Sequence, residues 1–496
     1  MAYFSTENIQ AILAGRVFQI SSQARLKRNS IGLMHGIFES MGQVAPAADV
    51  AILMVGTFKF SGAASTFSVI LAWLIYALWM VTPYQFSRIK ANAGSYYSYA
   101  ASSTKKGLLG PPTILSFMYY DITGAAFGIL GISSFLFLIS PEISNFHFLW
   151  IVFASAFTAY ITIVTYIGVK PSMKYLAWTG MAEIAFLFVA AIIIIVKAGP
   201  ANSVVPFTIP HNIGISAVLF GSIFSILDFT GSGVVTTVSE EMREPRKNIG
   251  KSILFAMILT AISLIPTTYA LTVGWGIGNI SGFAAVNDGG IIVFQKYLGI
   301  VGAILLIVFT VNSYLTNGVA KATAVSRLWY SAARDGVAIP RRFGAVHPKF
   351  RTPHMTLLLW SLGSFALDVT MGLIYGPKAA ALILTEGSGL AIISVHIMAN
   401  SGLTAYSIRN RNGKPWTQIL APTASSLIGV VVIVISVYFT ITSYLGAPSA
   451  SNLAYLISTI VTIAWILGAG FLVTLYYARR RPAVLVQAGE YDASAQ

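Results

Sequence analysis

The chain has 496 residues, of which 56% are hydrophobic and only 9% are charged, and its mean hydropathy is +0.75. Soluble domains carry about one quarter charged residues, so this composition excludes an ordinary soluble protein and predicts an integral membrane protein. The absence of cysteine excludes disulfides and thiolate chemistry, and the six histidines lack the spacing of a metal site. We therefore expect no metal and no other cofactor.

Apolar stretches near the roughly 20 residues that cross a bilayer recur along the whole chain. They predict an all-α integral membrane protein with twelve transmembrane helices. The predicted spans lie near residues 31–57, 63–86, 112–140, 147–168, 173–196, 212–242, 250–276, 298–330, 355–375, 379–403, 420–445 and 453–478.

The net charge of +15 is explained by membrane topology. Twelve spans place both termini on one side, and alternating assignment of the loops puts 27 of the 31 lysines and arginines there. The opposite side keeps only Lys59, Lys197, Lys296 and Lys378. Because cytoplasmic loops collect Lys and Arg, we predict cytoplasmic N- and C-termini and no nucleic-acid partner.

The first predicted span is interrupted at residues 39–46, which read Glu-Ser-Met-Gly-Gln-Val-Ala-Pro. Pro46 suits the first position of a new helix half. A proline kink beside a packing glycine is the alternative interpretation of this interruption.

The sixth predicted span is interrupted at residues 228–233, which read Asp-Phe-Thr-Gly-Ser-Gly. A helix in hydrocarbon must satisfy its own backbone, so an acid and two glycines at mid-depth must face protein or a water-filled cavity. The ends of such half-helices offer carbonyl and N–H groups that can hold an ammonium and a carboxylate. Paired interruptions five spans apart predict an inverted-repeat transporter with its binding site at the midplane.

Three stretches resemble the amino acid–polyamine–organocation (APC) superfamily of permeases. Residues 231–249 are similar to the end of the family's sixth helix, residues 326–353 to its eighth helix and following loop, and residues 93–99 to the segment after its second helix. Many relatives have an aromatic residue and then an acid where this chain has Ser232 and Gly233, so a contact through that acid is not carried over.

The resemblance covers roughly residues 32–411 and implies a LeuT-like fold, with two five-helix inverted repeats, discontinuous helices 1 and 6, and two further helices. The implied organisation is a cytoplasmic arm at 1–30, a ten-helix transport core at 31–403, helices 11 and 12 at 404–478, and a cytoplasmic tail at 479–496.

We expect a zwitterionic substrate to bind between the two interruptions. N–H groups near helix 1 would hold its carboxylate, carbonyl groups near helix 6 its ammonium, and Phe224 or Phe229 would cover its side chain. The candidate substrate-binding residues are Gly42, Gln43, Val44, Ala45, Phe224, Ile226, Leu227, Asp228, Phe229, Thr230 and Gly231. For Asp228, three roles stay open: attracting a cationic substrate, accepting a transported proton, or capping the N–H groups of residues 231–233.

Polar residues at other predicted depths are candidates for ion or proton coupling. Glu183 lies inside the fifth span, where it can carry a proton, coordinate a cation or make a structural hydrogen bond. Asn312 and Ser313 bring oxygens to mid-depth on the eighth span, where LeuT-like sodium carriers keep a hydroxyl pair, although such residues also join helices to one another. Asp121 and His396 also fall within predicted spans.

A charged cluster at the end of the sixth span is predicted to form a cytoplasmic gate. It contains Glu240, Glu241 and Arg243, with Arg327 and Arg334 as candidate partners. A solvated loop with weak surface ion pairs is the alternative.

Together these features predict a secondary active transporter that moves an amino acid across the plasma membrane by alternating access, coupled to protons or sodium. The alternative is an exchanger or facilitator for a polyamine or cationic amino acid. The chain contains no HExxH or Gly-x-Ser-x-Gly string, so we do not expect an enzyme. The expected partners are the lipid bilayer, a small-molecule substrate and a coupling ion.

Overall fold

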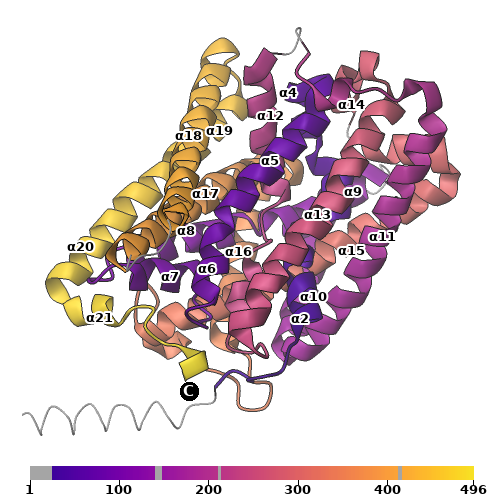
Figure 1. Cartoon of the computed structure of the whole chain (residues 1–496). Coiled ribbons are helices and arrows are strands. Elements are labelled where there is room, and N and C mark those ends of the chain that lie inside the picture. The colour runs from indigo at the N-terminus through magenta and orange to yellow at the C-terminus, as the bar shows by residue number, and fades with distance from the viewer. Residues whose placement is uncertain (1–24, 140–147, 211–213, 287, 411–415, 496) are drawn as a thin grey trace, which may run out of the picture.

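A computed structural model describes residues 25–139, 148–210, 214–286, 288–410 and 416–495 (Figure 1). The expectation for residues 1–24 of the N-terminal arm lies outside the described residues. Every regular element in the described ranges is a helix, in agreement with the predicted all-α protein. Ten helices in these ranges are long and apolar enough to cross a membrane.

The described elements fall into two halves along the chain. The first half contains α2 (Leu33–Val44), α3 (Pro46–Ala48), the π-helical η1 (Asp49–Leu53), α4 (Val55–Ser61), α5 (Ser65–Trp79), α6 (Val81–Ser87), α7 (Ser95–Ser103), α8 (Gly110–Thr123), α9 (Ala126–Ile139), α10 (Leu149–Ile167), α11 (Val169–Ala198), α12 (Gly214–Asp228) and the 3₁₀ segment η6 (Val234–Val238). The second half contains α13 (Pro245–Trp275), α14 (Ser281–Ala285), α15 (Gly289–Asp335), α16 (His354–Tyr375), α17 (Pro377–Arg409), α18 (Thr417–Gly446), α19 (Ala450–Ile463), the π-helical η9 (Ala464–Ala469), α20 (Gly470–Arg480) and α21 (Pro482–Gln487).

The first and sixth predicted spans are not among the ten long helices. In both regions the helix stops part-way, after Val44 and after Asp228, so neither region contains a single helix of membrane-spanning length. Pro46 lies in the first turn of α3, as predicted for a new helix half.

Several helix boundaries differ from the prediction for local reasons. The predicted eighth span began near residue 298, whereas α15 begins at Gly289 and changes direction at Gly299, whose φ is 71°. The predicted third span, 112–140, is divided into α8 and α9 by a turn at Gly124 and Ala125.

The interrupted helix α2 lies inside the bundle, whereas α12 packs mainly against α4 and α5. The α2 helix packs against α11, α13 and α15, while α17 packs against α8 and α18. Figure 1 shows α18, α19 and α20 along one edge of the molecule and α11 along the other.

The described chain begins and ends at the same end of the bundle, where Arg28 donates a hydrogen bond to the hydroxyl of Tyr491 over 3.4 Å (Figure 1). We call this the terminal end. An even number of membrane crossings would produce this arrangement, although the count of twelve stays a prediction.

Candidate functional site

The two helix interruptions touch each other at Gly231 and Gln43. Gly231 has a φ of 123°, and a Cβ atom there would lie 2.3 Å from Cγ of Gln43 and 3.1 Å from its carbonyl carbon. Only glycine permits both this backbone conformation and this approach. Opposite it, Ala45 adopts a left-handed conformation with φ 60° and ψ 59°, which separates α2 from α3.

Backbone groups at the sixth-helix interruption are already hydrogen-bonded. The carbonyl oxygens of Ile226 and Leu227 accept bonds from the N–H groups of Phe229 and Thr230 over 3.2 and 3.0 Å. The Gly231 N–H donates to the hydroxyl of Tyr76 over 3.2 Å. The Ile226 carbonyl also accepts the Thr230 hydroxyl over 3.3 Å. The expectation of free groups here is therefore corrected, and of the two carbonyls only that of Leu227 keeps a second lone pair for a substrate.

A cavity of about 40 Å³ lies beside this contact. Ligand pockets usually enclose several hundred Å³, so this cavity is small by comparison. The residues that line it are Gln43, Tyr76, Ser95, Tyr96, Phe117, Tyr120, Asp121, Thr230, Gly231, Gly233, Val234, Thr237, Lys321, Ala324, Val325, Leu328, Ile392 and His396.

The cavity brings together three of the predicted substrate-binding residues, Gln43, Thr230 and Gly231. The other predicted residues lie in the adjoining helices and do not line this cavity: Gly42, Val44, Ala45, Phe224, Ile226, Leu227, Asp228 and Phe229. Phe224 instead packs against Phe60, with ring centroids 5.3 Å apart.

Aromatic side chains from other helices form much of the cavity wall, and the sequence did not single out most of them. Tyr120 accepts a hydrogen bond from the side-chain amide of Gln43 over 3.3 Å. His396 stacks on Trp79 at 5.0 Å and meets the edges of Tyr76 and Tyr96. Among these residues, the sequence gave a signal only for Tyr96, within the Gly-Ser-Tyr stretch at 93–99, and for His396, within a predicted span.

Lys321 is the lysine that lines the cavity, and it is 4% exposed. The charge count had grouped it with the loop residues, which is wrong because it lies in the middle of α15. Its Nζ atom lies 4.2 Å from the ring centroid of Tyr120. Gly124 leaves room for it, since a Cβ atom there would be 2.5 Å from Nζ. Asp121 and Asp368 are its neighbouring opposite charges.

Glu183 links the first-helix interruption to α11 and α15. Its carboxylate accepts hydrogen bonds from the Ala47 N–H over 2.9 Å, the Ser313 hydroxyl over 2.8 Å and the Asn312 amide over 3.3 Å. The three predicted coupling residues therefore form one cluster, and Glu183 is only 2% exposed. The carboxylate occupies the position at the start of α3 where a helix N-terminus favours an anion.

Asp228 is buried, and its Oδ2 atom has no hydrogen-bond partner among the described residues. Both carboxylate oxygens of Asp49 are in the same situation, and the two acids interact electrostatically. Asp49, which has no hydrogen-bond partner among the described residues, is costly to bury beside Asp228 unless the two acids share a proton or hold a cation. Because the Gly231 N–H bonds to Tyr76, the capping role for Asp228 gains no support at that residue.

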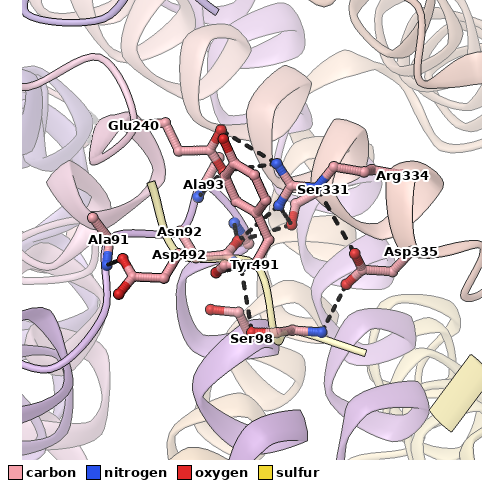
Figure 2. Close-up of polar contacts among 12 residues, drawn as sticks. Ala91, Asn92, Ala93, Ser98, Glu240, Ser331, Arg334, Asp335, Tyr491 and Asp492 are labelled. Carbon is pink, nitrogen blue, oxygen red and sulfur yellow. Dashed lines mark hydrogen bonds and ion pairs between the residues drawn. The ribbon is translucent and has the colours of Figure 1, made fainter. Parts of the chain in front are cut away.

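The predicted gate residues meet at the terminal end. Arg327 pairs with Glu241, and both side chains are 1% exposed. Arg334 pairs with Glu240 over 3.0 Å, and Glu240 also accepts a bond from the Ala93 N–H over 2.9 Å (Figure 2). The side chains of both pairs are largely shielded from water, unlike those of ion pairs in a solvated loop.

Arg243 does not join those ion pairs in the described structure. Its guanidinium donates to the carbonyl of Asn29 over 3.1 Å, and its N–H donates to the carbonyl of Ile31 over 2.9 Å. Glu241 in turn accepts the N–H of Ser30 over 2.8 Å through its carbonyl. Residues 29–31, just before α2, are thus tied to the end of the sixth-helix region.

The C-terminal tail covers this end of the bundle, which the sequence did not predict. The Tyr491 ring centroid lies 3.9 Å from the guanidinium carbon of Arg334, and the Gly489 N–H donates to Asp335 over 2.7 Å (Figure 2). Asp492 accepts bonds from the Ala91 N–H and from Arg246, each over 3.0 Å.

The electrostatics of Asp492 fit this attachment of the tail. Burial by itself raises the pKa of Asp492, but hydrogen bonds from Ser494, the Ala91 N–H and Arg246 outweigh burial and hold the pKa below its ordinary value of 3.8. The carboxylate is therefore ionised at neutral pH.

Two interrupted helices that meet beside a cavity with aromatic and charged residues in its wall, inside a bundle of membrane-spanning helices, define the class of multi-pass membrane transport proteins. The chain belongs to the amino acid permease family, because the family model described as "Amino acid permease" matches residues 35–486. The APC resemblance inferred from the sequence is thereby confirmed.

Curated relatives are similar to parts of the chain. It is 26% identical over 200 residues to the low-affinity putrescine importer PlaP of Escherichia coli strain K12, covering 40% of this chain and 43% of that protein. It is 23% identical over 262 residues to the branched-chain amino acid permease BcaP of Bacillus subtilis strain 168, covering 48% and 49%. The alignments thus span about half the length of these relatives or less.

Solved structures resemble the chain over nearly its whole length. A manganese transporter of Eremococcus coleocola, crystallised with an aromatic bis-isothiourea substituted compound, superposes with a TM-score of 0.55 and 10% identity. The match covers 94% of this chain and 99% of that one. At this identity the likeness shows the fold alone.

Proposed function

We propose that this protein is a secondary active transporter that carries an amino acid across the plasma membrane by alternating access, with proton coupling. In this proposal the chain crosses the membrane twelve times, helices 1 and 6 are discontinuous, and both termini are cytoplasmic. The observation that carries the proposal is the contact between the two interruptions, Gln43 against Gly231, at the edge of the cavity.

The polar groups around the cavity suit a substrate with both charges. The Lys321 ammonium can attract a carboxylate, while the Asp121 carboxylate can receive an ammonium. The aromatic wall of Tyr76, Tyr96 and Phe117 suits the apolar part of an amino acid. A buried cation at the cavity disfavours a substrate that carries only positive charges.

Proton coupling would act through Glu183. A carboxylate accepts all three of its hydrogen bonds, whereas a protonated carboxyl group must turn one oxygen into a donor. Protonation also removes the negative charge that strengthens the bond from the Ala47 N–H to Oε1, and this would loosen the first-helix interruption from α11 and α15. Sodium would instead need a set of oxygen ligands, for which Ser313 and Asn312 are candidates.

Alternating access would open the terminal end of the bundle. The inner half of the first helix, α2, and the segment from η6 to Arg243 would move together, because residues 30–31 are bonded to Glu241 and Arg243. This movement breaks the Glu241 pair with Arg327 and the Glu240 pair with Arg334, so these pairs are the gate in the proposal.

The second candidate is transport of a polyamine, favoured by the similarity to a putrescine importer and by the buried acids Asp49 and Asp228. Uptake of radiolabelled amino acids and of putrescine into proteoliposomes, with and without an imposed pH gradient, separates the two. We expect accumulation of one or more amino acids that collapses without the gradient. Uptake of putrescine alone would replace the first proposal with the second.

A further inference from the structure

A second, larger cavity lies at the terminal end, apart from the site between the interrupted helices. Its volume is about 690 Å³. Six basic residues line it, and none of the described residues in its wall is acidic: Arg25, Lys27, Arg28, Lys170, Lys349 and Arg351. They come from three segments far apart in the sequence, 25–28, 167–171 and 349–351. We call this cavity the basic cleft.

The backbone around the basic cleft is held in place by hydrogen bonds. Thr352 donates its hydroxyl to the carbonyl of Tyr166 over 2.9 Å, which fixes the loop after α15 to the end of α10. Within that loop the His347 N–H donates to the Thr352 carbonyl over 2.8 Å, and the Arg351 N–H donates to the His347 carbonyl over 2.9 Å. The positive charges are therefore brought together by folded structure, and they repel one another across the cleft.

An apolar surface begins where the basic cleft ends. Ile167 lines the cleft and is 47% exposed, and Ile163 lies one turn earlier on α10 with 58% exposed. Trp178 on the neighbouring α11 is 73% exposed. In a multi-pass membrane protein such side chains face the acyl chains of lipids. The basic cleft thus supplies positive charge that can bind an anion, and the apolar surface beside it can contact acyl chains.

We propose that the basic cleft binds the headgroup phosphate of an anionic phospholipid, whose acyl chains lie along α10 and α11. Basic pockets at the ends of membrane helices recognise such headgroups. The general excess of Lys and Arg in loops at this end explains the residue types. It does not explain why six of them converge on one cavity whose described lining residues include no acid. A free phosphate would use the charges and leave the apolar surface unused.

A bound headgroup would stabilise the closed terminal end. Residues 25–28 of the cleft continue directly into Ser30 and Ile31, which are bonded to the backbone of Glu241 and Arg243. The other two cleft segments belong to α11 and to the loop between α15 and α16. The lipid therefore bridges the segment that precedes α2 to the surrounding helices.

Binding is tested without any transport assay, on the full chain purified in a neutral detergent. Thermal unfolding is measured during titration with short-chain phosphatidylglycerol, with phosphatidylcholine, and with inorganic phosphate. We expect a saturable rise of the unfolding temperature with phosphatidylglycerol and little change with the other two. In Lys170→Gln/Arg351→Gln the apparent affinity should fall roughly 30-fold, about fivefold for each charge removed.

Two control variants keep this experiment decisive. Lys105→Gln/Lys106→Gln removes two exposed charges outside the basic cleft and should bind like wild type. Lys170→Arg/Arg351→Lys keeps the charges and should also bind, which separates lost charge from disturbed folding. Equal responses of the wild type and the Lys170→Gln/Arg351→Gln variant would overturn the proposal. So would a full response to inorganic phosphate, which would make the cleft a site for free anions.

Discussion

Arg327 and Glu241 form an ion pair that is almost completely enclosed, with both side chains 1% exposed. The guanidinium reaches both carboxylate oxygens, with Nη2 and Oε1 3.2 Å apart, and Arg327 also donates to the Thr323 carbonyl over 3.1 Å. The pair joins α15 to the end of the sixth-helix region. The net contribution of this pair to stability is reduced by the large free-energy cost of removing two charges from water.

We predict that Arg327→Met alone lowers stability by about 3–5 kcal/mol, because it leaves the Glu241 carboxylate buried without its partner. The double variant Arg327→Met/Glu241→Gln should recover most of the loss. Thermal unfolding of the purified variants measures both effects. Equal loss in the single and double variants would show that the pair is not the source of the effect.

The tail prediction concerns Tyr491, whose ring covers Arg334. Tyr491→Ala, or truncation after Arg481, should loosen the terminal end, because the stacking and the backbone bonds of residues 489–493 are lost. The chain has no native cysteine, so a single Ser239→Cys, at a residue 1% exposed, reports opening through its rate of maleimide labelling. We expect labelling several-fold faster in the tail variants.

Tyr438→Ala, at a tyrosine 61% exposed on α18, is the matched control and should leave labelling unchanged. The attachment also depends on pH through Asp492. Its pKa is lowered by folding, so its contribution is complete above about pH 4 and is lost as the pH falls through the lowered pKa. Unchanged labelling after truncation would contradict a closing role for the tail.

Glu183→Gln should abolish accumulation driven by a pH gradient and preserve counterflow exchange, because the amide keeps the side-chain shape but cannot exchange a proton. Ser313→Ala removes one hydrogen bond to the carboxylate and should only weaken accumulation. Substrate uptake into proteoliposomes is measured once with an imposed pH gradient and once as counterflow exchange. Normal accumulation by Glu183→Gln would remove this residue from the coupling mechanism.

Lys321→Met should weaken apparent affinity for an amino acid by at least about tenfold, because a unit charge at about 4 Å is worth about 4 kcal/mol at an effective dielectric constant of 20. Uptake of putrescine should rise in the same variant, since a buried positive charge is removed from the cavity. Lys321→Arg keeps the charge and serves as the control. A shift of both substrates in the same direction would assign Lys321 to folding.

The sequence predicted the helical membrane architecture and the interruptions because both follow from local rules. Long apolar stretches identify helices, and acids, glycines and prolines inside them mark where the backbone must be satisfied differently. Pro46 and Gly231 carry such local signals, and the structure places both at irregular backbone.

The cavity wall and the tail could not be predicted because they depend on contacts between distant segments. Lys321 looks like a loop lysine by charge counting, and only the packing of α15 against α8 brings it over Tyr120. The residues around Tyr491 do not indicate that it contacts another segment. Its contact with Arg334 exists only in the folded chain. Neither contact can be predicted from the periodicity of the sequence.

The central claim is that a small substrate binds where the two interruptions meet, and an electron cryomicroscopy map at saturating substrate tests it most directly. The account predicts substrate density in an enlarged cavity, in contact with residues 43–47 on one side and residues 226–233 on the other. Density elsewhere in the bundle, with these two segments still in their mutual contact, would contradict it.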